Sequence, residues 1–136
     1  MNRALEATLP IVYDAGALVA AEADAPYLRA IHTTALNEGR ALVVPTPVLT
    51  QVWRNGARQA RVARLLRGCR LEPTSEPVAK HAGVLLGRTR TSDAVDAIVV
   101  ATAVTHSASI VTSDPDDLAA LIEAAAVARP PALVRI

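Results

Sequence analysis

Four short apolar runs stand out along the chain between longer segments in which apolar and polar residues mix. They are IVY at 11–13, ALVV at 41–44, SIVTS at 109–113 and ALVRI at 132–136. Runs of this length, bounded by polar residues, are typical of strands buried in a sheet. We therefore expect four strands, with the last of them at an edge of the sheet.

The segments between these runs repeat their apolar positions at helical spacing. Thr46 followed by Pro47 is a favourable helix start, and Thr91 or Ser92 would cap the helix that carries SDAVDAIVVATAV. Cys69 would close the apolar stripe of the preceding Arg-rich helix. Helices are expected over 15–23, 25–38, 47–54, 62–69, 75–88, 92–104 and, after a turn, 114–126.

Strands that alternate with helices predict βα units, and such units build a mostly parallel sheet. We therefore expect an α/β fold with helices on both faces of a central sheet. The chain has 136 residues, of which 51% are apolar, which is enough for one core. Because no repeat or linker interrupts the pattern, a single domain over residues 1–136 is expected.

The N-terminal sequence, the apolar runs and the cysteine content indicate in which compartment the protein is found. The first residues, MNRALEATLP, lack the apolar core of a signal peptide, and no apolar run approaches the length of a membrane span. The lone Cys69 excludes an internal disulfide and suits a reducing compartment. These features predict a cytoplasmic protein. The net charge of +1 gives no global signal for nucleic acid, although six of the fourteen basic residues lie between Arg54 and Arg70.

Aspartates follow the predicted strands or begin the next helix. Asp14 follows IVY, Asp114 follows SIVTS, and Asp93 and Asp96 open the SDAVDAIVVATAV segment. Parallel strands bring their carboxyl ends to one edge of the sheet, so these carboxylates should meet there. Carboxylates that meet repel one another unless they are protonated or bind a cation. An all-oxygen ligand set suits Mg²⁺ or Mn²⁺.

Four motifs in order carry a resemblance to a known family. VYDAGAL, VVPTPVLTQVWR, TSDAVDAIVVATA and IVTSDPDDL together resemble the PIN domain, particularly the single-domain VapC-type toxins of toxin-antitoxin pairs. The resemblance covers nearly the whole chain. It implies a ribonuclease that depends on Mg²⁺ or Mn²⁺, is usually a homodimer, and is held inactive by a cognate antitoxin.

The resemblance also implies roles for individual residues. Its acidic core falls on Asp14, Asp96 and Asp114, and its accessory acids fall on Asp93 and one of Asp116 and Asp117. One position departs from the family pattern, because Gln51 stands where a glutamate is usual. A glutamine oxygen can bind a metal weakly or orient a water molecule, but it carries no charge and cannot act as a general base.

The chemistry expected of this acidic edge is hydrolysis of phosphodiester bonds by a metal-activated water. The Thr112 hydroxyl could hydrogen-bond a carboxylate or the scissile phosphate. Arg54, Arg58 and Arg61 are candidates for contacts to RNA phosphates. Trp53 is expected to be a buried anchor, and with only two tyrosines beside it the chain offers little support for base stacking.

Two other classes of function are open to the same sequence. A PIN-like module that no longer cuts would act by binding RNA or a partner protein, and Gln51 favours this alternative. A phosphotransfer domain also places an aspartate after a strand. It fits poorly, because Ala15 and Gly16 follow Asp14 without a second aspartate, and no lysine follows the SIVTS strand.

Overall fold

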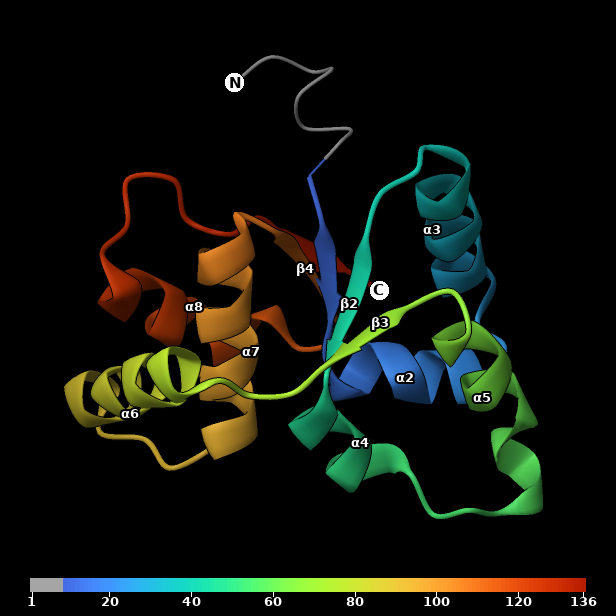
Figure 1. Ribbon diagram of the computed structural model, residues 1–136, viewed down its shortest axis with the longest axis horizontal. Helices are drawn as coiled ribbons and strands as arrows, with labels where there is room; N and C mark the ends of the chain where they lie inside the picture. Colours follow the sequence, from blue (N-terminus) through green and yellow to red (C-terminus); the bar gives the residue numbers. More distant parts are fainter. Residues whose placement is uncertain (1–8) are drawn as a thin grey trace.

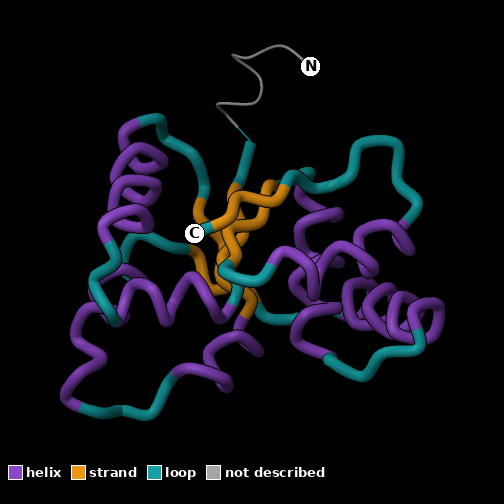
Figure 2. Tube along the Cα trace, turned by 180° about the vertical axis from the view of Figure 1, so that it is seen from behind, coloured by secondary structure: helices purple, strands orange, loops and turns teal. Residues whose placement is uncertain are grey.

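The structure is a computed structural model that describes residues 9–136. Within these residues one sheet holds five strands, all parallel, in the order β3-β2-β1-β4-β5 (Figures 1 and 2). The strands are β1 (Ile11–Tyr13), β2 (Leu42–Pro45), β3 (Arg70–Glu72), β4 (Ser109–Thr112) and β5 (Leu133–Arg135). The parallel sheet confirms the predicted α/β fold class.

Helices cover both faces of the sheet. In Figure 1, α6, α7 and α8 lie on one side of the strands, and α2, α3 and α5 lie on the other. The helices are α2 (Ala15–Glu22), α3 (Pro26–Asn37), α4 (Thr46–Val52), α5 (Ala60–Leu66), α6 (Glu76–Thr89), α7 (Ala94–His106) and α8 (Pro115–Ala125), and a 3₁₀ turn, η1 (Ala57–Gln59), precedes α5.

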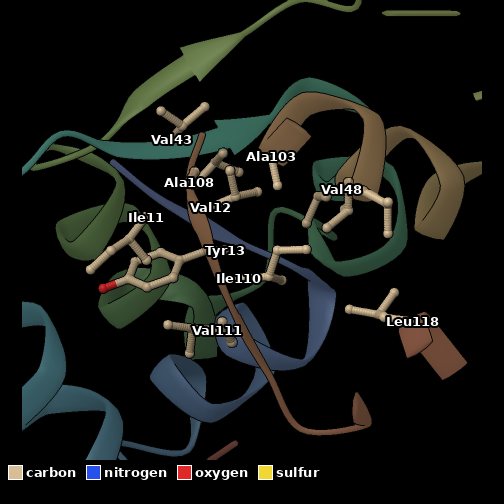
Figure 3. Packing of buried hydrophobic residues seen from close by; sticks show 14 of the residues in the cluster. Ile11, Val12, Tyr13, Val43, Val48, Ala103, Ala108, Ile110, Val111 and Leu118 are labelled. Carbon is tan, nitrogen blue, oxygen red and sulfur yellow. The ribbon is translucent and has the colours of Figure 1, made fainter. Parts of the chain in front are cut away.

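The core is built on the central strands. Every residue of β1 and β2 is buried, as are Ile110 and Val111 of β4, because helices cover these strands on both faces (Figure 3). Helix α7 is apolar on most of its surface and packs against β1, β2 and β4. The rigid centre of the sheet therefore carries the residues that follow β1 and β4.

The strand β3 was not expected from the sequence. Its three residues, Arg70, Leu71 and Glu72, include two charged side chains and form no apolar run. As an edge strand it is largely exposed, so its sequence does not need the apolar residues that a buried strand requires. The preceding helix ends at Leu66, and Cys69 lies in the turn before β3 rather than in the helix where it was expected.

Two predicted helix caps were wrong by one or two residues. Helix α4 begins at Thr46 itself, and Pro45 is its N-cap, because β2 runs up to Pro45 and leaves no residue between strand and helix. Helix α7 is capped by Asp93 rather than by Thr91 or Ser92. Since Asp93 is then part of the helix start, its carboxylate is fixed relative to the first turn of α7.

None of the helices between residues 9 and 136 is long and apolar enough to cross a membrane. The expectation that the chain lacks a signal peptide concerns its first residues, of which 1–8 lie outside the described part of the chain.

Candidate metal centre

Two strands deliver aspartates to the same edge of the sheet. Asp14 directly follows β1, and Asp114 lies two residues after β4. The two strands are parallel neighbours, with Tyr13 opposite Val111, and the Asp14 N–H donates to the Val111 carbonyl at 3.3 Å. The fold therefore brings the beginnings of α2 and α8 together, as the sequence predicted.

Asp14 is buried and serves as the N-cap of α2. It is only 8% exposed, and its Oδ1 accepts the N–H of Ala17 at 3.0 Å. Burial raises the pKa of Asp14, and the negative charge of Asp114 adds to this rise. Hydrogen bonds from Thr112, Ala17 and Gly16 lower the pKa and offset part of the rise. Asp14 is thus well hydrogen-bonded, but burial and the charge of Asp114 still disfavour its ionised form.

Thr112 joins the two aspartates that follow the strands. It is fully buried, and its Oγ1 accepts the backbone N–H of Asp114 at 3.0 Å. The hydroxyl also hydrogen-bonds the Asp14 side chain and lowers its pKa. Because the oxygen accepts from Asp114, its own hydrogen is free to be donated to the Asp14 carboxylate. One hydroxyl therefore fixes the start of α8 relative to Asp14.

Gly16 allows the loop after β4 to approach α2. A Cβ atom at Gly16 would overlap the Oγ of Ser113 and would lie 3.1 Å from the Ser113 backbone nitrogen. Any larger residue would push the loop that carries Asp114 away from Asp14. The approach of Asp114 to Asp14 therefore requires that residue 16 carry no side chain, and the sequence alone does not reveal this requirement.

Helix α7 contributes two more carboxylates. Asp93 caps the helix, and its Oδ1 accepts the N–H of Asp96 at 2.9 Å. The pKa of Asp96 is raised to about 7, first by burial and then by the negative charges of Asp93, Asp117 and Asp14. Asp96 therefore lies within electrostatic reach of acids from α2, α7 and α8.

Helix α8 brings Asp117, and not Asp116, toward this edge. The pKa of Asp117 is raised first by a hydrogen bond with the Asp114 side chain, then by the charge of Asp114, and to a smaller extent by Asp93. Asp116 acts on Asp117 only as the weakest of these neighbours. The sequence had left open which of the two faces the other acids.

These five carboxylates, Asp14, Asp93, Asp96, Asp114 and Asp117, are called the acidic edge below. Between residues 9 and 136, no arginine, lysine or histidine forms an ion pair with any of them. Also within that range, no three acidic, histidine or cysteine side chains lie close enough to hold an ion as placed. The five carboxylates fit a divalent cation in charge and donor type.

The sequence of this chain matches one family model, that of the PIN domain, over residues 11–124. The chain belongs to the PIN domain family. The resemblance drawn from the four motifs is thereby confirmed.

Solved structures share the fold of this PIN domain. A toxin-antitoxin complex from Klebsiella pneumoniae is similar at 18% identity with a TM-score of 0.64, over 80% of this chain and 90% of that chain. The crystal structure of VapBC2 from Rickettsia felis bound to a DNA fragment from their promoter is similar at 13% identity with a TM-score of 0.67, over 93% of this chain and 98% of that chain. No curated protein matches the sequence.

Gln51, the departure from the PIN pattern, lies on the outer part of α4. Helix α4 follows β2 and packs against α2 and α7, so it borders the acidic edge. The Gln51 side chain is exposed. Among residues 9–136 the side-chain amide of Gln51 makes no hydrogen bond. The backbone carbonyl of Gln51 accepts a hydrogen bond from the Arg54 guanidinium at 3.3 Å. The amide is therefore not held in one orientation by any hydrogen bond to the described residues.

The three arginines proposed for RNA contacts differ in their surroundings. Arg54 donates to the carbonyls of Trp53 at 2.8 Å and Thr50 at 3.2 Å, which satisfies the end of α4. Arg61 donates to the carbonyl of Glu22 at 3.2 Å. Within the described residues, the Arg58 side chain makes no hydrogen bond or ion pair. Arg58 is therefore the most available of the three.

Trp53 is not the buried anchor that its large apolar side chain suggested. It is 40% exposed, because α4 ends at Val52 and the buried positions of that helix are Val48 and Val52.

Gln59 was not singled out from the sequence. This residue is only 5% exposed, although it stands in an arginine-rich segment typical of a solvated surface.

A substitution at Thr112 tests the link between the two aspartates. Thr112→Val keeps the shape of the side chain but leaves the Asp114 N–H unpaired and removes a hydrogen bond to Asp14. We expect a loss of about 1–3 kcal/mol in the free energy of unfolding, measured by urea denaturation in a chelator. Thr112→Ser retains the hydroxyl and should recover most of the loss. Equal stability of the valine variant and the parent protein would refute the link.

Proposed function

We propose that this PIN domain is a Mg²⁺- or Mn²⁺-dependent endoribonuclease and the toxin of a toxin-antitoxin pair. PIN domains are generally nucleases, so membership in the family supports cleavage of nucleic acid. The observation that carries the proposal is the acidic edge. It gathers five carboxylates that form no ion pair with a cationic side chain of residues 9–136, and three of them have raised pKa values.

Asp14, Asp96 and Asp114 are the residues proposed to hold the metal, with Asp93 and Asp117 beside them. A divalent ion bound there supplies an activated water and neutralises charge that develops on the phosphate. Thr112 holds Asp14 and Asp114 in their relative positions through its two hydrogen bonds. Asp93 holds the backbone of Asp96 in the same way. The chain therefore supplies positioning, and it needs no nucleophilic side chain.

The proposed substrate is RNA rather than DNA, and this choice rests on the resemblance to VapC-type toxins. Arg58 is free to contact phosphate, and Arg54 and Arg61 each retain N–H groups beyond those that bond carbonyls. Contacts from arginine to phosphate add affinity without selecting a sequence. The preferred cleavage site would therefore depend on other contacts.

The proposed partners are a cognate antitoxin and a second copy of the chain. Both solved structures reported above are toxin-antitoxin complexes by their descriptions, and they share this fold at low identity. A cytoplasmic location is part of the proposal, because RNA and such partners are found there.

The alternative is a PIN module that binds RNA or a partner without cutting. Gln51 is the observation in its favour, because the carboxylate usual at this position is missing. Binding of divalent metal alone does not separate the two functions, since an inactive module could retain the ion. Cleavage by the purified protein separates them.

The first test of the proposal is loss of cleavage on removal of one acid. Asp96→Asn should lower the rate of cutting a fluorescent single-stranded RNA in Mn²⁺ by about 100-fold or more, because a proposed ligand is lost. The variant should melt higher than the parent protein in chelator, since a repelling charge is removed. Glu76→Gln, which removes an exposed carboxylate that is not part of the acidic edge and pairs only with the exposed Lys80, is the control and should change neither result by more than a small amount. Full activity of Asp96→Asn would rule out the proposed centre.

The second test restores a carboxylate at position 51. Gln51→Glu should tighten Mn²⁺ binding and raise cleavage if its side chain turns toward the acids. In chelator the same variant should melt lower than the parent protein, because a like charge joins the acidic edge. Thr50→Glu adds the same charge one residue away on α4 and serves as the matched control.

Equal shifts in melting for the two glutamate variants, with unchanged cleavage, would place Gln51 outside the centre. The departure from the family pattern would then have no bearing on activity.

A further inference from the structure

The loop that follows α4 presents an aromatic ring to solvent close to the acidic edge. All residues from Trp53 to Arg58 are exposed, and Trp53, the only tryptophan of the chain, is 40% exposed. Helix α4 begins at the carboxyl end of β2, beside β1, and its seven residues span about 10 Å. The ring therefore lies about one short helix away from the sheet edge that carries Asp14.

Gln59 holds this exposed loop in one shape. Its Nε2 donates to the Val52 carbonyl at 2.6 Å, and its Oε1 accepts the backbone N–H of Arg54 at 2.7 Å. Because Gln59 is buried, its bond to Val52 is shielded from water, and its bond to Arg54 is partly shielded. The Arg54 guanidinium adds bonds to the carbonyls of Thr50 and Trp53. The loop is thus fixed at both ends before any ligand binds, which lowers the entropy cost of binding.

Basic side chains line the hollows next to the loop. One hollow of about 410 Å³ has Arg54 and Arg58 in its wall, and a second of about 710 Å³ has Arg58 and Arg61. The two hollows share Glu22, Ala57 and Arg58, so they adjoin. Arg58 stands between them with its guanidinium free of hydrogen bonds to the described residues.

We propose that the loop from Trp53 to Arg58 binds single-stranded RNA, with a base stacked on Trp53 and phosphates held by Arg58 and Arg61. The inference rests on the proposed function and names how its substrate is held. An exposed aromatic ring beside cations matches the two components of a single strand, its unpaired bases and its charged backbone. Double-stranded RNA presents no free base face to Trp53, so the surface selects single strands.

The single tryptophan makes the test direct. Tryptophan fluorescence of the full chain is measured in chelator, so that no cleavage occurs, during titration with an eight-nucleotide single-stranded RNA. We expect quenching that saturates at the same RNA concentration as the anisotropy of a labelled RNA. An RNA of the same length and charge made of abasic nucleotides should bind about tenfold or more weakly, and should leave the fluorescence unchanged.

Substitutions separate stacking from charge. Trp53→Leu should weaken binding by about tenfold, whereas Trp53→Phe keeps a ring and should recover much of it. Arg58→Ala should lower the slope of binding against salt by about one, and should leave the fluorescence change at saturation intact. Tyr27→Leu, which replaces a 59% exposed ring on α3, is the control and should bind as the parent protein does.

Three outcomes would overturn the inference. The first is RNA binding without a change in fluorescence. The second is equal RNA binding by Trp53→Leu and the parent protein with unchanged mass by light scattering. The third is equal RNA binding with a fall in the mass of Trp53→Leu, which would assign the ring to an interface between copies. If the parent protein cuts RNA in Mn²⁺ and Trp53→Leu cuts it with the same KM, only this inference fails. If the parent protein neither binds nor cuts RNA, both this inference and the proposed function fail.

Discussion

Repulsion among carboxylates at one edge of the sheet is the constraint on which the rest of this structure depends. Because β1 and β4 are parallel neighbours, the residues after them emerge at the same edge, and the starts of α7 and α8 add more negative charge. Helix N-termini favour negative charge and offset part of the cost. Backbone N–H groups and the Thr112 hydroxyl offset more. The raised pKa values of Asp14 and Asp96 show that burial and repulsion still outweigh these contacts.

The raised pKa of Asp96 has a consequence for stability. The folded protein holds this proton up to a pH of about 7, whereas an unfolded chain releases it near its ordinary pKa of 3.8. The contribution of Asp96 to stability is therefore complete below pH 3.8 and is lost as the pH rises through about 7. As the pH rises above about 7, a divalent cation at the acidic edge would offset the repulsion that protonation no longer relieves.

The sequence predicted the parts of the fold in which burial leaves a pattern. The buried strands β1, β2 and β4 are apolar runs, and the aspartates that follow them could be placed at one edge because parallel strands share direction. The edge strand β3 could not be predicted, since Arg70 and Leu71 are exposed and its three residues carry no periodic signal.

Contacts that depend on the folded path were also beyond the sequence. Gly16 resembles any helical glycine until Ser113 is seen against it, and Gln59 resembles a surface residue until its two bonds to the backbone are seen. Trp53 was misplaced because apolar character predicts burial, whereas α4 ends one residue before it. The choice of Asp117 over Asp116 depends on how far α8 turns after Pro115, which spacing alone does not give.

The most direct test of the acidic edge is an NMR titration of the Asp96 carboxyl carbon, first in chelator and then with Mg²⁺. The account predicts a metal-free pKa of about 7 and a fall toward the ordinary value of 3.8 when Mg²⁺ is present. A metal-free pKa near 3.8, or a raised pKa that Mg²⁺ leaves unchanged, would contradict it.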